Sequence, residues 1–260
     1  IDTLAEWAAI PTAMLQRDVA RLVGDWLPDS TVALLADRQT TDPVTLLLIS
    51  LAFGIGLVYL VIDALRDRLG EPTAQRLKLA AISGIIALLV CGQTVLFIGL
   101  RHITAPAAYT HDGGVIQTEV TIQYLLVGVN PYVADYLDTP MAEWGTDYRT
   151  ALYHYPYLPW TFLLSAPFYL LAHLVLGWYD QRMVYLLLWA LTLVLACRLA
   201  RPGAARLGSL MVIGLNPILA SDVIFGQNDS FVLFWIVLGV WLLGGAAPGL
   251  VPGRWMRGVG

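Results

Sequence analysis

Charged residues are scarce in this chain. Asp, Glu, Lys and Arg make up 13% of its 260 residues, about half the share found in a water-soluble domain, which excludes a water-soluble fold. Cysteine is scarcer still: Cys91 and Cys197 both fall in apolar runs, which excludes a disulfide framework and a thiolate metal site. The chain has no basic patch with interleaved aromatic residues, and its formal net charge is −4. We therefore expect no binding to nucleic acid.

Apolar residues, by contrast, make up 58% of the chain and are grouped in long runs without charge. A helix rising about 1.5 Å per residue crosses a hydrocarbon core of about 30 Å in roughly 20 residues. The sequence therefore predicts an all-α fold, a polytopic transmembrane helical bundle, over residues 44–260. Residues 1–43 alternate apolar and charged residues at helical spacing, which predicts an amphipathic segment on the membrane surface. The six apolar runs are Val44–Ile62, Leu79–Leu100, Tyr157–Trp178, Met183–Cys197, Leu207–Ser221 and Ser230–Leu243.

The distribution of Lys and Arg predicts which of these runs cross the bilayer. Short cytoplasmic loops collect basic residues, and the loops at 66–78 and 198–206 both do so. If all six runs crossed, these two loops would face opposite sides of the membrane. The conflict disappears if Tyr157–Trp178, which contains two prolines and a histidine, lies on the outer surface as a juxtamembrane helix. We therefore predict five spans and a large external loop at 101–178 containing juxtamembrane helices, with the turn at 222–229 on the same side.

A cluster of polar residues follows the second span, at His111, Asp112 and, beyond two glycines, Glu119. A carboxylate just outside a span, beside glycines that let another molecule approach the backbone, suits a general base at the membrane surface. Asp112 can equally cap a helix running from about Gly114 to Val127, since helix N-termini favour a carboxylate. Periodicity alone favours this capping alternative.

A second cluster contains Tyr153, His154 and Tyr155, preceded by Arg149. Tyrosines are typical of the boundary between water and lipid, which explains their presence without a site. His154 and Arg149 could instead bind a phosphate, which arginine contacts through two parallel hydrogen bonds. Both interpretations stay open, and we take all four residues as candidates for substrate binding.

A third cluster lies between the last two spans, where Asp222 is followed by Gln227 and Asp229. The two acids stand at the outer ends of successive spans, so helix capping explains each of them. Pro217, within the preceding run, bends a helix and frees backbone groups, which is tolerated where neighbours or water satisfy them. Because the turn is more polar than a hairpin requires, we favour a substrate-binding role for Asp222, Gln227 and Asp229.

Taken in chain order, these motifs resemble the GT-C superfamily of polytopic glycosyltransferases, particularly mannosyltransferase-like and ALG-type members that use polyprenyl-phosphate sugars. The resemblance covers roughly residues 79 to 245. Family members usually continue through more spans, and here an extra span comes first, so we expect an amino-terminal portion of an enzyme or a shortened relative. The matching pieces are His111-Asp112-Gly113-Gly114, the segment Gly128 to Tyr132, the segment Tyr153 to Leu158, and Asn216-Pro217 leading to Gly226-Gln227-Asn228-Asp229.

This resemblance implies transfer of a sugar from a polyprenyl-phosphate donor to an acceptor hydroxyl on the extracytoplasmic face of the cell membrane, with inversion at the anomeric carbon. It implies that Asp112 is the catalytic base, with Glu119 as a secondary candidate. The departing phosphate needs positive charge, for which His111, Arg149 and His154 are the nearest candidates.

Two other classes of function compete with the transferase. The first is a catalytically silent, GT-C-derived structural subunit of a larger membrane complex, which a stop codon after Gly260 would favour and several further spans would oppose. The second, a transporter, would place ionisable residues at mid-span, whereas these spans keep their charges at the ends, so it ranks last. No cluster has metal-ligand spacing, so no cofactor is predicted, although some relatives bind divalent ions. The expected partners are the lipid-linked sugar, the bilayer and other membrane subunits.

Overall fold

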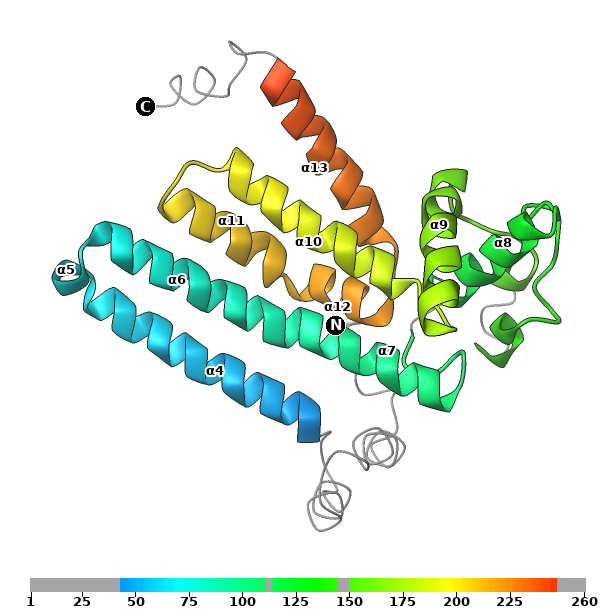
Figure 1. The fold of residues 1–260 in the computed structure, drawn as a ribbon, viewed down its shortest axis with the longest axis horizontal. Coiled ribbons are helices and arrows are strands. Elements are labelled where there is room, and N and C mark those ends of the chain that lie inside the picture. Colours follow the sequence, from blue (N-terminus) through cyan, green and yellow to red (C-terminus); the bar gives the residue numbers. More distant parts are fainter. Residues whose placement is uncertain (1–42, 111–113, 145–149, 247–260) are drawn as a thin grey trace.

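The computed structural model describes residues 43–110, 114–144 and 150–246. Within these ranges every regular element is a helix, which confirms the all-α prediction. The amphipathic segment predicted at 1–43 lies outside the described residues apart from its last position. The elements, shown in Figure 1, are α4 (Pro43–Ala64), α5 (Arg66–Leu69), α6 (Glu71–Ile86), the π-helical turn η1 (Ala87–Gly92), α7 (Gln93–Thr104), α8 (Ile116–Leu126), the 3-10 helix η2 (Pro140–Trp144), α9 (Pro159–Leu176), α10 (Arg182–Leu199), α11 (Ala204–Gly214), α12 (Pro217–Phe225) and α13 (Asp229–Ala246).

The first two long helices form an antiparallel hairpin (Figure 1). The turn between them uses α5 and Gly70, whose φ of 78° favours glycine, and Lys78 of α6 forms an ion pair with Asp63 of α4. Helices α6, η1 and α7 run on as one helix of 34 residues, Glu71–Thr104, about 51 Å long at 1.5 Å per residue. This helix is longer than the predicted span Leu79–Leu100, because it continues into polar sequence at both ends.

Helix α10 packs against α7, α11, α12 and α13. The chain then bends by 50° between α11 and α12, where Asn216 accepts hydrogen bonds from the backbone N–H groups of Ile218 at 2.9 Å and Leu219 at 3.3 Å. Asparagine is a favoured N-cap, and proline is favoured at the first helical position. Pro217 therefore begins a new helix after a break, rather than kinking one continuous span.

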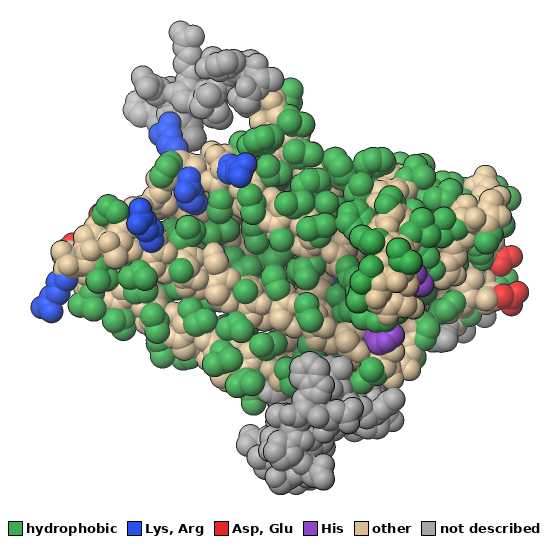
Figure 2. Space-filling view, in the orientation of Figure 1, with side chains coloured by type: hydrophobic (Ala, Val, Ile, Leu, Met, Phe, Trp, Pro, Cys, Tyr) green, Lys and Arg blue, Asp and Glu red, His purple; other side chains and the backbone are tan. Residues whose placement is uncertain are grey.

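Several helices meet the length and apolarity needed to cross a membrane. Four do so alone, namely α4, the joined α6–α7 helix, α9 and α10, and the bent pair α11–α12 adds a fifth if it counts as one span. Their outward faces are apolar: Phe53 of α4 is 70% exposed, and Figure 2 shows hydrophobic side chains over most of the visible face. These features identify a multi-pass membrane protein. The apolar part of α13, Asp229–Leu243, is shorter, and its crossing stays a prediction.

Helix α9 runs across the end of the long helices rather than beside them (Figure 1). The end of α7 touches the start of α10, because Arg101 binds Asp180 at 2.8 Å. The chain between these residues therefore returns to the face from which it left. Since α8, with 11 residues, is about 16 Å long and too short to cross, one crossing by α9 would be unbalanced. This connectivity favours the predicted juxtamembrane position of α9.

The two ends of the bundle differ in charge. Lys and Arg gather at the end that carries α5 and the α10–α11 connection, whereas His lies toward the opposite end (Figure 2). We call the first the basic end, and the second, where α7 finishes and α10 begins, the loop end. Because cytoplasmic loops are rich in Lys and Arg, the basic end is predicted to face the cytoplasm.

Two apolar cores meet along α10. One packs α8, α9 and the loop end around Tyr155, Phe162 and Tyr185, and the other packs α7, α10 and α12 around Phe97 and Trp189. Helix α10 contributes to both cores, so the residues at its start are buried between them.

Candidate functional site

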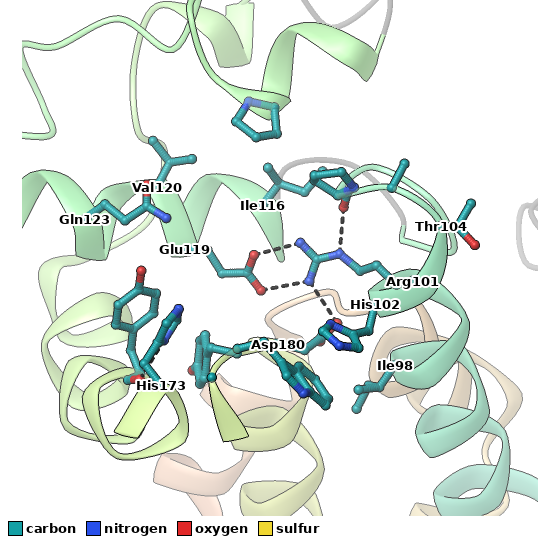
Figure 3. A pocket seen from close by; sticks show the side chains of 17 residues that line it. Ile98, Arg101, His102, Thr104, Ile116, Glu119, Val120, Gln123, His173 and Asp180 are labelled. Carbon is teal, nitrogen blue, oxygen red and sulfur yellow. Dashed lines mark hydrogen bonds and ion pairs between the residues drawn. The ribbon is translucent and has the colours of Figure 1, made fainter. Parts of the chain in front are cut away.

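Four charged side chains from distant parts of the chain meet at the loop end: Arg101, Glu119, Asp180 and Arg182. Nη1 and Nη2 of Arg101 donate to the two carboxylate oxygens of Glu119 at 2.9 and 2.7 Å, and Nη1 also donates to Asp180 at 2.8 Å. In Figure 3, Arg101 and Glu119 face each other, with Asp180 beside them. We call these four residues the charge network. Its two positive and two negative groups balance, as burial requires.

Arg182, the first residue of α10, is fully buried. Its Nε and Nη2 donate to the two oxygens of Asp180 at 2.9 and 2.7 Å. Nη1 donates to the carbonyls of Tyr109 at 2.7 Å and Ile224 at 3.1 Å, and Nη2 donates to the carbonyl of Phe97 at 3.3 Å. One guanidinium thereby holds α7, the segment after α7 and the end of α12 together. The three lie at one end of the bundle.

The two carboxylates of the charge network respond differently to their surroundings. Burial alone would raise the pKa of Asp180, but Arg182 and Arg101 together lower it below its ordinary value. Burial raises the pKa of Glu119 above its ordinary value, although Arg101 acts in the opposite direction. As the pH falls, Glu119 is therefore the first member of the charge network to take up a proton.

A pocket of about 360 Å³ opens beside the charge network. Its polar lining includes Glu119, Gln123 and Asp180, and His102 and His173 lie on opposite sides of it (Figure 3). The ring of His102 stacks on Trp178 with 4.3 Å between ring centroids. The volume falls in the range of small-ligand sites, and carboxylate, amide and aromatic groups together suit a ligand rich in hydroxyl groups.

Three of the predicted site residues, His111, Asp112 and Arg149, lie outside the described residues. The chain next to the first two is nevertheless fixed at the loop end. The carbonyl of Gly114 accepts a hydrogen bond from the hydroxyl of Tyr185 at 3.0 Å. Gly114, the last residue of the glycine-rich motif, is therefore buried and anchored.

Helix α8 begins at Ile116, and its N-cap position is Val115. Asp112 lies outside the described residues, so the capping alternative stays a prediction. Glu119 lies in the first turn of α8, where the helix dipole favours a negative charge. Its carboxylate accepts from Arg101 twice and from the backbone N–H of Gln181 at 2.9 Å. These three hydrogen bonds favour a positioning role for Glu119 over a role as the base.

The second predicted cluster packs against α8. Tyr155 is buried, and its hydroxyl lies 3.3 Å from Thr118 Oγ1. Nε2 of Gln117 donates to the carbonyl of His154 at 2.8 Å, while the side chains of Tyr153 and His154 are exposed. Tyr155 therefore packs in the apolar core, whereas Tyr153 and His154 are accessible to solvent or lipid at the loop end.

The turn of the third predicted cluster lies against the start of α8. The carbonyl of Asp222, a buried residue, accepts from the backbone N–H groups of Gly226 at 2.8 Å and Gln227 at 2.7 Å, which ends α12. Gly226 has a φ of 87°, and a Cβ there would lie 2.1 Å from the side chain of Val115. Gln227 is half-buried, and Asp229, the first residue of α13, is exposed. The turn and the start of α8 are thus in close contact, and their shared side of the membrane stays a prediction.

Sequence reasoning missed three members of the charge network. Arg101 is the first residue of the predicted external loop, and Asp180 and Arg182 lie between two predicted apolar runs, so none of them stood out as a site residue. The signal that could have identified Asp180 and Arg182 is a pair of opposite charges two residues apart between two apolar runs.

Comparison of the chain with known protein families, with curated proteins and with solved structures finds no match. The chain is therefore defined here by its fold class, an all-α multi-pass membrane protein, and by its loop-end site.

Proposed function

We propose that the chain is a membrane glycosyltransferase that transfers a sugar from a polyprenyl-phosphate donor to an acceptor hydroxyl at the loop end, outside the cytoplasm. The observation that carries the proposal is the convergence of the three motif-bearing segments at this end. Arg182 binds the carbonyls of Tyr109 and Ile224, and Gly226 packs on Val115. Motifs about 110 residues apart in sequence therefore border one region, as a shared active site requires.

In the proposed reaction, the Asp112 carboxylate takes the proton from the acceptor hydroxyl. The hydroxyl oxygen attacks the anomeric carbon from the face opposite the phosphate and forms the new glycosidic bond. The bond between the anomeric carbon and the phosphate oxygen breaks, and the lipid phosphate leaves with the electron pair. The anomeric configuration is inverted. A positioned carboxylate base accounts for about 10²–10⁴ of the rate acceleration of such a step.

The leaving phosphate needs a positive partner. Arg101 and Arg182 do not serve, because their guanidinium groups donate to carboxylates and backbone carbonyls of the charge network. His111, Arg149 and the exposed His154 are the proposed partners. The charge network instead has a structural role, because it joins α7, α8 and α10 beside the proposed site.

The test is Asp112→Asn in the full chain, reconstituted in liposomes with a polyprenyl-phosphate sugar and an alcohol acceptor. We expect transfer to fall about 100- to 10,000-fold while binding of the donor is kept. The matched control is Asp138→Asn, which removes an exposed acid from the same external loop and should leave transfer unchanged. Full turnover by Asp112→Asn removes Asp112 from the role. A wild-type chain without transfer from any such donor favours the structural subunit.

A further inference from the structure

A second cavity lies at the other end of the molecule, between α6, η1, α10 and α11. It measures about 460 Å³, and its walls are mostly apolar, with Ile86, Leu193 and Leu210 among them. Small side chains, including Ala87 and Ala190, leave the space open. We call this cavity the inner groove.

The length of the inner groove matches one leaflet of a bilayer. Trp189 and Arg198 both line it, and α10 rises about 14 Å over the nine residues between them. That is about half of a hydrocarbon core of about 30 Å. Since Arg198 lies at the basic end, the leaflet is the one predicted to face the cytoplasm.

Two arginines stand at the mouth of the inner groove. Arg198 is exposed and Arg206 half-buried, and Nε of Arg206 donates to the carbonyl of Cys197 at 3.1 Å. Across the described ranges, neither forms an ion pair with a carboxylate. By contrast, Arg101 and Arg182 at the loop end are both neutralised by acids. The mouth thus carries positive charge that the described protein does not compensate.

We propose that the inner groove binds one anionic phospholipid of the cytoplasmic leaflet. An acyl chain lies along α10 toward Trp189, and the phosphate is bound by Arg198 and Arg206. Arginine binds phosphate oxygens through paired, charge-assisted hydrogen bonds, and anionic lipids are concentrated in the cytoplasmic leaflet. The site is remote from the loop end, so the proposal stands independently of the transferase activity.

The test uses native mass spectrometry of the purified full chain in detergent, with phosphatidylglycerol and phosphatidylcholine of identical acyl chains as probes. We expect one phosphatidylglycerol to be retained per chain and phosphatidylcholine to bind more weakly. Arg198→Gln and Arg206→Gln should each weaken retention of phosphatidylglycerol about fivefold, which is about 1 kcal/mol per basic residue. Arg66→Gln is the matched control, because Arg66 lies at the basic end but does not line the inner groove, and it should leave retention unchanged.

A second variant separates the acyl chain from the headgroup. Ala190→Phe places a ring in the inner groove and should reduce retention while both arginines remain, whereas Arg206→Lys keeps the charge and should keep part of the affinity. Circular dichroism of each variant checks that it is folded. Equal retention of both lipids, or no effect of either Arg→Gln change, would overturn the proposal and indicate nonspecific lipid only. Crosslinking of Cys197 to a second protein chain would also overturn it, because the groove would then be covered by protein.

Discussion

The charge network predicts that the effects of two substitutions on the free energy of unfolding are not additive. Replacing Arg182 by Met leaves the network with one excess negative charge, and replacing Asp180 by Asn leaves it with one excess positive charge. Making both changes leaves Arg101 paired with Glu119, which is balanced again. We therefore expect each single variant to be strongly destabilised and the double variant to be less destabilised than the sum of the two.

The magnitude follows from the contacts. Arg182→Met removes both hydrogen bonds to the oxygens of Asp180 and leaves the carbonyls of Tyr109 and Ile224 without this donor. Removing one partner of a buried ion pair costs about 3–5 kcal/mol, and we expect a loss in this range for each single variant. Residues in one network couple by up to about 3 kcal/mol. The double variant should therefore fall short of the sum by about 2 kcal/mol.

The measurement is the free energy of unfolding of the full chain in mixed micelles, followed by tryptophan fluorescence. Arg66→Gln is the control, because the Arg66–Asp67 pair is largely exposed and exposed pairs contribute little. Strict additivity of the two changes, or a loss below about 1 kcal/mol for Arg182→Met, would refute the argument that these charges are buried and interdependent.

The charge network also predicts how the stability of the chain depends on pH. Arg182 and Arg101 hold the pKa of Asp180 below its ordinary value against the effect of burial. Its contribution to stability is therefore complete above the unfolded-state pKa of about 3.9 and is lost as the pH falls through that value toward the lower folded-state pKa. Glu119 also titrates on acidification, and Asp180 raises its pKa, so both chains in the comparison carry Glu119→Gln. The double variant Glu119→Gln/Asp180→Asn should lose less stability than Glu119→Gln alone between about pH 5 and about pH 3, and equal losses would contradict the assignment.

Two further predictions concern the turn after α12 and the membrane topology. Gly226→Ala should destabilise the chain by about 1–3 kcal/mol more than Gly128→Ala, because its Cβ would collide with Val115 whereas Gly128 has open space at a similar positive φ; equal unfolding free energies would contradict the contact. In a chain without cysteines, Tyr153→Cys should react with an impermeant maleimide from outside the cell, and Arg201→Cys only after permeabilisation. Labelling of both from one side would refute the topology.

The sequence predicted where the helices lie better than how far they extend. The first span was predicted as Val44–Ile62, close to the observed helix Pro43–Ala64. The two agree because the apolar run and the helix end at nearly the same residues. The second was predicted as Leu79–Leu100 within a helix that runs Glu71–Thr104. Hydropathy registers only the part suited to lipid, whereas a helix continues through polar residues as long as its backbone hydrogen bonds are made.

The charge network could not be predicted in this way. Arg101 meets Glu119 across 18 residues and Asp180 across 79, and Arg182 reaches the carbonyl of Phe97 across 85. A local pattern shows only that Arg101, Asp180 and Arg182 stand at the ends of apolar runs, and solvation at a membrane surface would explain that equally well. The pairing arises from tertiary packing, which brings these three residues together with Glu119.

The composition and the connectivity of helix α9 indicate different positions in the membrane. Its 18 residues are apolar enough to cross a membrane, but the contact between Arg101 and Asp180 requires the chain to leave and return on one face. On its outward side, Leu174 is 84% and Val175 70% exposed, which suits a helix lying with this side in lipid. The same helix contributes Tyr169 and His173 to the loop-end pocket. Under the proposed function, a lipid-linked donor in the outer leaflet would meet this pocket at the depth of its own headgroup, without leaving the membrane.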